Sequence, residues 1–172
     1  MKKIIKRILY YFIKKCAFVF RPLGQKVYVK TLICAYNILG GIKFNGLPKF
    51  IHYNSYLDNL GGLEIGKDVV ISTNVIILTH DFSYNVGLLA VNKAPDTDQC
   101  IFQKVILDDY CFIGAGTIIL PGSIVGKYSV IGAGSIVKGN IPPYSVVAGN
   151  PAKIIGNVFD LANKFNNNAT EK

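Results

Sequence analysis

Residues 101–136 read IFQKVI, LDDYCF, IGAGTI, ILPGSI, VGKYSV and IGAGSI, six consecutive units of six residues. The first position of each unit is aliphatic, and these positions are Ile101, Leu107, Ile113, Ile119, Val125 and Ile131. The fifth position is small or β-branched, and these positions are Val105, Cys111, Thr117, Ser123, Ser129 and Ser135. An α-helix repeats its apolar residues every 3.6 positions and an ordinary strand every 2, so neither element produces this period.

A six-residue period is typical of a flat-sided coil, in which each unit forms one short strand and one corner. The aliphatic residue points into the coil, and the small residue fits the crowded interior beside the corner. Three units close a triangular turn of about 18 residues, and successive turns stack about 4.8 Å apart as parallel strands. A β-sandwich with coincidental spacing is the alternative, and six uninterrupted units argue against it. The sequence therefore predicts an all-β fold, a parallel β-helix.

The same phase continues, more weakly, toward the N-terminus. Ile65, Ile71 and Ile77 occupy first positions, and Leu47 fits the same phase. The phase is also kept between Ile77 and Ile101, although the sequence between them does not repeat. We therefore expect a protruding loop to interrupt the coil. We expect a helical N-terminal segment at residues 1–44 and the coil at residues 45–156. The loop within the coil is expected at residues 82–100, and a tail at residues 157–172.

The N-terminal segment holds the excess positive charge of the chain. Residues 1–30 contain nine Lys and Arg and no acidic residue, whereas the remaining ten Lys match the ten Asp and Glu of the chain. A neutral body without a basic stripe argues against a nucleic-acid partner. Apolar residues within 1–20 recur every three or four positions, as on one face of a helix. They are Ile4, Ile5, Ile8, Leu9, Phe12, Ile13, Cys16, Ala17 and Phe20.

Two interpretations of this basic amphipathic helix stay open. It suits the surface of an anionic membrane, which would hold a cytoplasmic protein at the inner face of the membrane through residues 1–22. It equally suits packing on the protein's own body or on a sister subunit, as a cap over an open end. Lys14 and Lys15 interrupt the apolar run, so the segment is neither a signal peptide nor a transmembrane span.

The four cysteines are typical of free thiols in a reducing cytosol. None has the spacing of a zinc site, and we expect no metal. Cys111 falls on a fifth position of the repeat, so we assign it to the core.

Residues 113–155, IGAGTIILPGSIVGKYSVIGAGSIVKGNIPPYSVVAGNPAKII, resemble the hexapeptide-repeat acyltransferases. The stretch is similar to the maltose and galactoside O-acetyltransferases and to bacterial polysaccharide O-acetyltransferases. The resemblance extends from about residue 45 to 156. It implies a left-handed coil, a homotrimer with active sites between subunits, and acetyl-CoA as co-substrate.

Acyl transfer from a thioester to a hydroxyl needs a base for the incoming proton. The chain has two histidines, His52 and His80. His80 lies in the stretch ILTHDF, where the coil gives way to the loop, and the catalytic histidine of the resembling family sits at this junction. The resemblance therefore implies that His80 is the catalytic base. We interpret His52 as a surface or structural residue, with lining of the acceptor site as the alternative.

The residue that orients the His80 ring is left open among Asp58, Asp81 and a backbone carbonyl. Asn54 and Asn59 precede His80 by about one coil, where the resembling family binds its acceptor. Both are therefore candidates for acceptor binding.

In the resembling family the pantetheine arm of coenzyme A runs along a groove beside the C-terminal coils. The matching positions here are the small residues Ala115, Ala133, Ser135 and Gly149, although corner geometry requires small residues in any case. Lys138 and Lys153 are candidates for contacts with the phosphates of coenzyme A.

The resulting prediction is a CoA-dependent O-acetyltransferase that acts on a sugar hydroxyl, most specifically on a precursor of a cell-surface polysaccharide. N-acetylation of an amino-sugar nucleotide is the alternative within the enzyme class. A binding or structural solenoid is the alternative outside it. A zinc hydratase on the same coil would need three histidines, and the chain has two.

Overall fold

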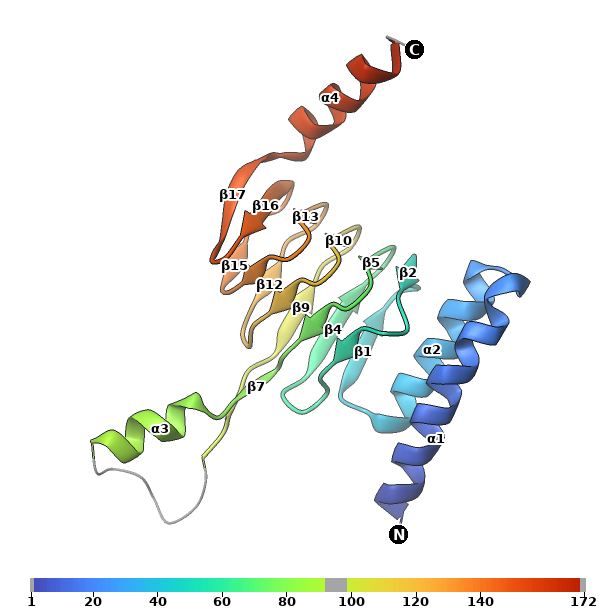
Figure 1. Ribbon diagram of the computed structural model, residues 1–172, viewed down its shortest axis with the longest axis vertical. Helices are drawn as coiled ribbons and strands as arrows, with labels where there is room; N and C mark the ends of the chain where they lie inside the picture. The colour runs from blue at the N-terminus through green and yellow to red at the C-terminus, as the bar shows by residue number, and fades with distance from the viewer. Residues whose placement is uncertain (1, 92–98, 171–172) are drawn as a thin grey trace.

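The computed structural model describes residues 2–91 and 99–170, which form a triangular coil flanked by helices (Figure 1). Within these residues the coil has three sides, each a sheet to which every turn adds a strand. Side 1 consists of β1 (Ile42–Asn45), β4 (Leu63–Gly66), β9 (Val105–Leu107), β12 (Ile124–Val125) and β15 (Asn140–Ile141). Side 2 consists of β2 (Phe50–Ile51), β5 (Val70–Ile71), β10 (Phe112–Ile113), β13 (Val130–Ile131), β16 (Ser145–Gly149) and β17 (Ala152–Asn157). Side 3 consists of β3 (Tyr56–Leu57), β6 (Ile76–Ile77), β11 (Ile118–Ile119) and β14 (Ile136–Val137).

Pairing between turns is parallel and follows the predicted period. Leu107 pairs with Val125, so a turn in this part of the coil takes 18 residues. The first turn is longer, because Ile42 pairs with Leu63, 21 residues later. From Leu107 onward the first and fifth positions of the repeat are buried. The predicted β-helix of hexapeptide repeats, with an N-terminal helical region and a protruding segment, is confirmed.

The buried serines of the repeat show why small polar residues suit the interior beside a corner. The Ser135 hydroxyl donates to the backbone carbonyl of Gly132 at 2.6 Å, and the Ser129 hydroxyl donates to that of Pro142 at 2.9 Å. These bonds satisfy a buried hydroxyl without requiring another side chain.

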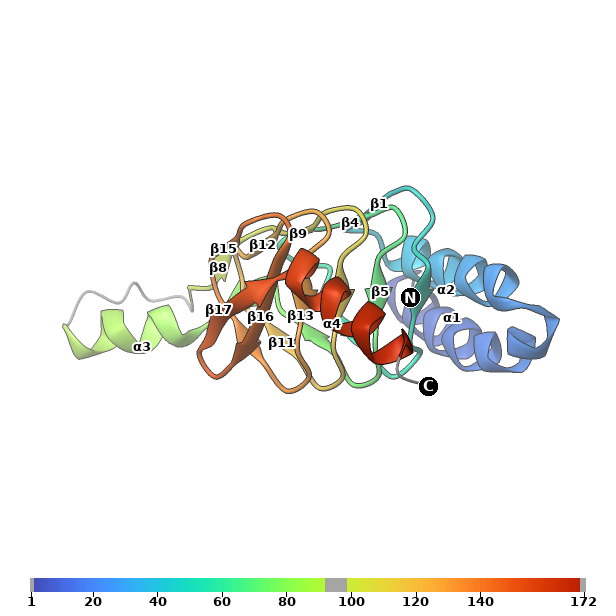
Figure 2. The ribbon, with the colours of Figure 1, turned by 90° about the horizontal axis from the view of Figure 1, so that it is seen from above.

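An excursion interrupts the coil after β6. β7 (His80–Asp81) and β8 (Ile101–Phe102) pair in antiparallel fashion at its base, and α3 (Ser83–Ala90) projects away from the coil (Figure 2). The predicted loop at 82–100 includes residues 92–98, which lie outside the described residues. The assignment of Ile101 to the coil interior is wrong. Ile101 is only partly buried and belongs to the antiparallel pair, which cannot continue a parallel coil, so the coil resumes at Val105.

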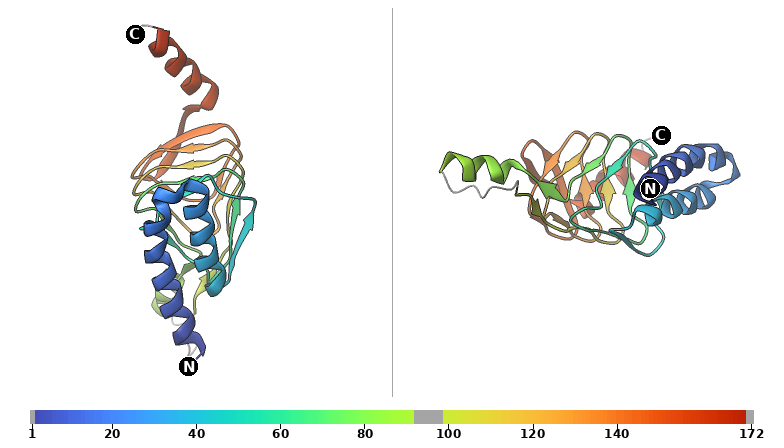
Figure 3. Two further views of the ribbon diagram at one scale, coloured as in Figure 1. Left: turned by 90° about the vertical axis from the view of Figure 1, so that its right-hand side faces the viewer. Right: turned by 90° about the horizontal axis from the view of Figure 1, so that it is seen from below.

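A helical hairpin covers the open end of the first turn (Figure 3, left). It consists of α1 (Lys2–Ala17), the 3-10 helix η1 (Phe18–Leu23) and α2 (Gln25–Leu39). Backbone N–H groups of each turn donate to carbonyls of the next, so the outward carbonyls of the first turn lack a partner within the coil. The hairpin provides the donors. Tyr28 Oη donates to the Ile51 carbonyl at 2.8 Å, and Lys14 Nζ donates to the Ser55 carbonyl at 2.8 Å.

The face of α1 that packs overlaps only in part with the apolar face that the sequence pattern marks: Ile13 and Ala17 belong to both, but Tyr10 does not belong to the predicted face. Tyr10 and Ala17 are buried, whereas Ile8 and Phe12 are each 65% exposed. The exposed apolar face of α1 also includes Ile4, Ile5 and Leu9. Within residues 2–91 and 99–170, no helix combines the length and apolar character that a bilayer crossing requires.

A stack of aromatic rings runs along the corner between side 1 and side 2. Tyr110, Tyr128 and Tyr144 of successive turns lie with ring centroids 4.7 and 5.3 Å apart, and Phe159 of α4 (Val158–Thr170) extends the stack. The three tyrosines have φ values of 60 to 62°, which bulky residues rarely adopt. Stacking between turns offsets this backbone strain. We call these four residues the aromatic ladder.

Candidate functional site

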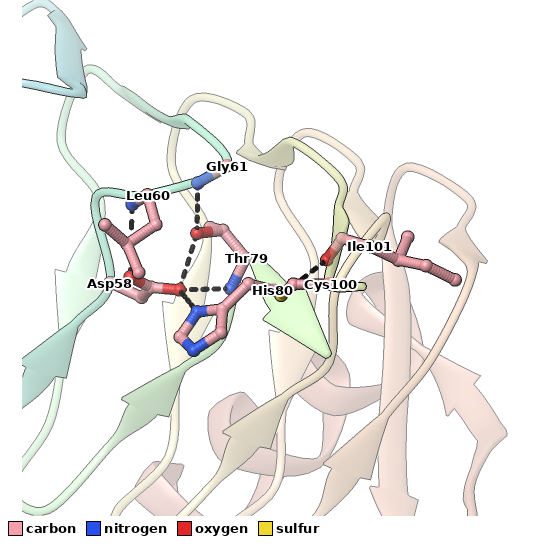
Figure 4. A network of polar contacts seen from close by, with 7 residues as sticks. All are labelled: Asp58, Leu60, Gly61, Thr79, His80, Cys100 and Ile101. Carbon is pink, nitrogen blue, oxygen red and sulfur yellow. Dashed lines mark hydrogen bonds and ion pairs between the residues drawn. The ribbon is translucent and has the colours of Figure 1, made fainter. Parts of the chain in front are cut away.

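The candidate site lies where segments leading from side 3 to side 1 meet the excursion, at the corner that we call the His80 corner. Asp58 follows β3 and His80 follows β6, so adjacent turns place the two residues side by side (Figure 4). His80 Nδ1 lies 2.5 Å from Asp58 Oδ2. The His80 side chain is 22% exposed, whereas the Asp58 side chain is 1% exposed. The pair therefore has a buried carboxylate behind an imidazole that solvent and ligands can reach.

Three further donors of the corner hold the Asp58 carboxylate in place. Thr79 donates to Oδ2 from its hydroxyl at 2.6 Å and from its backbone N–H at 2.9 Å, and the Leu60 N–H donates to Oδ1 at 3.1 Å. The Thr79 hydroxyl in turn accepts the Gly61 N–H at 2.8 Å. Burial acts to raise the pKa of Asp58, but hydrogen bonds from Thr79 and His80 outweigh it, so the pKa lies below its ordinary value. Asp58 is therefore ionised at neutral pH.

An ionised Asp58 determines which ring nitrogen of His80 carries the proton. A carboxylate can only accept a hydrogen bond, so Nδ1 of a neutral His80 must be the protonated nitrogen. Nε2 then carries the free lone pair, on the side of the ring away from Asp58 (Figure 4). This is the arrangement of a histidine oriented to accept a proton at Nε2.

The sequence prediction missed three residues of this corner. Thr79 is fully buried and positions Asp58, although it does not occupy a diagnostic position of the repeat. Phe82 and Phe102 flank the imidazole, with ring centroids 6.0 and 6.3 Å from that of His80. The T-H-D-F stretch at residues 79–82 contains two of the three, Thr79 and Phe82, but Phe102 is brought in only by the antiparallel pairing of β7 and β8.

Among the partners considered for His80, Asp58 makes the contact and Asp81 does not. Asp81 Oδ1 instead accepts the Ser83 N–H at 2.7 Å, at the start of α3. The amide of Asn59 donates to the Gly40 carbonyl at 2.8 Å and so ties the His80 corner to the end of α2. Asn54 lies at another corner, between sides 2 and 3, with His52. His52 stacks on Tyr53 with centroids 4.7 Å apart. The structure therefore separates the two histidines.

The residues predicted to contact coenzyme A fall into more than one place. Ala115, Ala133, Ser135 and Gly149 gather at the corner between sides 2 and 3, where the Gly149 N–H donates to the Ser135 hydroxyl at 3.2 Å and the Gly134 N–H donates to the Ala115 carbonyl at 2.8 Å. Lys138 lies instead at the His80 corner, where its charge helps to lower the pKa of Asp81, after the larger effect of the bonds from Ser83. Lys153 lies on β17, opposite Ala148.

Comparisons with known proteins find hexapeptide-repeat transferases. A family model described as bacterial transferase hexapeptide, with six repeats, matches residues 104–139. WbbJ of Escherichia coli K12, named for O-acetyl transfer in lipopolysaccharide biosynthesis, is 33% identical over 110 residues, covering 61% of this chain and 56% of that protein. Galactoside O-acetyltransferase of Lactococcus lactis is 30% identical over 143 residues, covering 82% of this chain and 65% of that protein. The chain thus spans less than two thirds of the length of either relative.

A solved structure of a galactoside acetyltransferase in complex with coenzyme A has the same fold. Its TM-score is 0.62 at 20% sequence identity, with 91% of this chain and 80% of that chain covered. Together these matches confirm the resemblance to the hexapeptide-repeat acyltransferases that the sequence predicts.

Proposed function

This chain carries the bacterial transferase hexapeptide repeat. We propose that it is an O-acetyltransferase that moves an acetyl group from acetyl-CoA to a saccharide hydroxyl, with His80 as the catalytic base. The observation that carries the proposal is the contact between His80 Nδ1 and the buried Asp58 carboxylate, at the point where the excursion breaks the coil. A binding or structural solenoid has no need of an imidazole oriented in this way.

The reaction follows from the orientation of the ring. The acceptor oxygen attacks the thioester carbonyl carbon while its proton passes to Nε2 of His80. The tetrahedral intermediate then loses the coenzyme A thiolate as the C–S bond breaks, and the imidazolium returns the proton to that sulfur. Asp58 stabilises the imidazolium and keeps the proton on Nδ1. Backbone N–H groups of the Gly-rich coil are our candidates for stabilising the oxyanion.

Coenzyme A binding is the part of the proposal that involves a second subunit. The small residues proposed to line its pantetheine arm lie at the corner between sides 2 and 3, whereas His80 lies at the corner between sides 3 and 1. A trimer, as the resemblance implies, would bring the small-residue corner of one subunit to the His80 corner of the next. Lys138 and Lys153 are our candidates for its phosphates.

The acceptor is proposed to be a precursor of a cell-surface polysaccharide, met at the cytoplasmic face of the membrane. The exposed apolar face of α1 supports this placement, because Lys and Arg accompany it and residues 1–30 contain no acid. Such a helix suits the surface of an anionic bilayer.

A thiol-release assay with acetyl-CoA and a panel of saccharides tests the transfer reaction. The panel contains neutral glycosides, lipid-linked saccharides and amino-sugar nucleotides, so that N-acetylation would also be detected. His80→Ala should lower turnover about 100-fold or more, as loss of a general base does. His52→Ala, the matched change at another corner, should leave turnover within about twofold. Unchanged turnover in His80→Ala would contradict the assignment.

Sedimentation with phosphatidylglycerol vesicles tests the membrane placement. Replacing Ile8 and Phe12 by Ser should weaken vesicle binding about tenfold or more, because both side chains would lose apolar contact with the bilayer. Replacing Val86 and Leu89 by Ser on α3, where both are also exposed, is the matched control. Equal binding by the two double variants would remove α1 as the membrane contact.

A further inference from the structure

A groove separates α1 from the third side of the coil beside the His80 corner. Its volume is about 610 Å³. From α1 it is lined by Ile4, Lys6, Arg7, Tyr10, Tyr11 and Lys14, and from the coil by Tyr56, Leu57, Asn59 and Leu60.

The groove is positively charged. Lys6, Arg7 and Lys14 line it, and no Asp or Glu does so among the described residues. Lys14 is held by the Ser55 carbonyl, but in the described part of the chain no carboxylate lies within ion-pair distance of Lys6 or Arg7. Two unneutralised cations beside a third favour an anionic ligand with more than one charge.

The groove and the catalytic pair share one short segment of chain. Leu57, Asn59 and Leu60 line the groove, while Asp58 between them turns its carboxylate inward to His80. The pKa of Tyr56 also reflects how close the groove lies to Asp58. Burial and then the Asp58 charge raise the pKa of Tyr56, whereas Arg7 acts to lower it, so this ring lies within reach of both charges. An anion beside Arg7 would therefore hold its attached group close to the His80 corner.

We propose that this groove binds the diphosphate of the acceptor, so that the substrate is a diphosphate-linked saccharide. The inference rests on the proposed acetyl transfer and names its substrate class. Lys6 and Arg7 hold the diphosphate, and the sugar extends past Leu60 toward Nε2 of His80. The carrier on the other side of the diphosphate is a lipid or a nucleoside. The exposed side chains of Ile4 and Leu60 offer apolar contact to a lipid carrier.

Equilibrium binding tests the groove without relying on catalysis. The probes are geranyl diphosphate, uridine diphosphate and inorganic pyrophosphate, measured by calorimetry against the full-length protein. Replacing Lys6 and Arg7 by Gln should weaken binding of at least one organic diphosphate about tenfold or more, since two charge-assisted contacts are lost. Replacing Lys26 and Lys30 by Gln removes the same charge from exposed positions of α2 and is the matched control.

The carrier follows from the comparison of probes. Tighter binding of geranyl diphosphate identifies a lipid carrier, and tighter binding of uridine diphosphate identifies a nucleotide carrier; both support the proposal. Equal affinity of wild type and the Lys6/Arg7 variant for all three probes would overturn it, as would an equal loss in the Lys26/Lys30 control.

Turnover separates failure of this inference from failure of the proposed function. With a diphosphate-linked saccharide, the Lys6/Arg7 variant should show a raised KM and a retained kcat, whereas neutral glycosides should show no change. His80→Ala should abolish transfer to both acceptors and keep the diphosphate affinity. If His80→Ala retains both diphosphate binding and full turnover, the catalytic assignment of His80 is refuted, but the diphosphate site in the groove is not.

Discussion

The regular half of the coil and the N-terminal hairpin both have clear apolar periods, yet the two periods differ in what they predict. Between Val105 and Val137 the first and fifth positions of every six-residue unit are buried. In α1 the period identifies a helix but only part of its packed face, because Tyr10 is buried and Lys14 bonds to the coil while Ile8 and Phe12 face outward.

The difference has a physical cause. A coil encloses its own interior, so an apolar residue that points inward has only one destination. A helix at the end of a coil meets a row of unpaired carbonyls instead, and side chains with donors satisfy them. Tyr28 and Lys14 face the coil for this reason, which leaves the apolar residues of α1 for another partner.

Our proposals place the chemistry on the coil and the acceptor contacts on the hairpin, and Asp58→Asn is the strongest test of this division. The amide can present an N–H to Nδ1 of His80 and so favour the wrong tautomer, which should lower kcat about 10²- to 10⁴-fold. Asp81→Asn changes an acid next to His80 that does not contact the imidazole, and kcat should stay within about twofold. Equal kcat values in steady-state thiol release would contradict the orienting role of Asp58.

Paired Ile→Ala substitutions test the difference in packing directly. Ile131 is fully buried in the coil, so Ile131→Ala should lower the free energy of unfolding by about 2–5 kcal/mol. Ile8 is exposed on α1, so Ile8→Ala should change it by less than about 0.5 kcal/mol. Urea titrations followed by circular dichroism measure both values. A large loss in Ile8→Ala would show that the outer face of α1 is buried in solution by a second subunit.

The aromatic ladder tests whether regularity also stabilises the outside of the coil. Tyr128 stacks on Tyr110 and Tyr144, so Tyr128→Ala should lower the free energy of unfolding by about 1–2 kcal/mol. Tyr11→Ala on α1 removes an exposed ring outside the ladder and serves as the control. The same denaturation series applies, and an unchanged midpoint in Tyr128→Ala would mean that the stacked rings add nothing to stability.

Lys14 gives the hairpin a pH dependence of its own, opposite in sign to that of the buried Cys111 thiol, whose pKa burial raises to about 12. Burial lowers its pKa from 10.5 to about 8. Above pH 8 the folded protein loses this proton while the unfolded chain keeps it, so the free energy of unfolding should rise with pH between about 8 and 10.5. Because the side chain is partly exposed, the gain is about 1 kcal/mol.

Denaturation at pH 7.5 and at pH 9.5 measures this gain. Lys14→Met should abolish it, whereas Lys15→Met, an exposed neighbour on α1, should retain it. A slope that persists in Lys14→Met would assign the titration to another group.

How far the sequence predicts this structure depends on how far the repeat extends. From the regular units one can predict the three sides of the coil, the residues that point inward and the break in the coil at His80. The units do not fix Ile101, because a residue can keep the phase of the repeat while pairing outside the coil. The partner of His80 stayed open for a related reason. Asp58 lies in an irregular early turn of 20 residues, where Tyr56 pairs with Ile76, and no repeat position aligns it with His80.

The hydrogen bonds between the hairpin and the first turn also bear on solubility. Parallel coils can in principle grow without limit, because each exposed end is a template for another strand. Here the side chains of Tyr28 and Lys14 already occupy carbonyls that an incoming strand would need. The donors that fasten the hairpin to the coil thus also terminate strand addition, and their loss would expose a seed for end-to-end fibre growth.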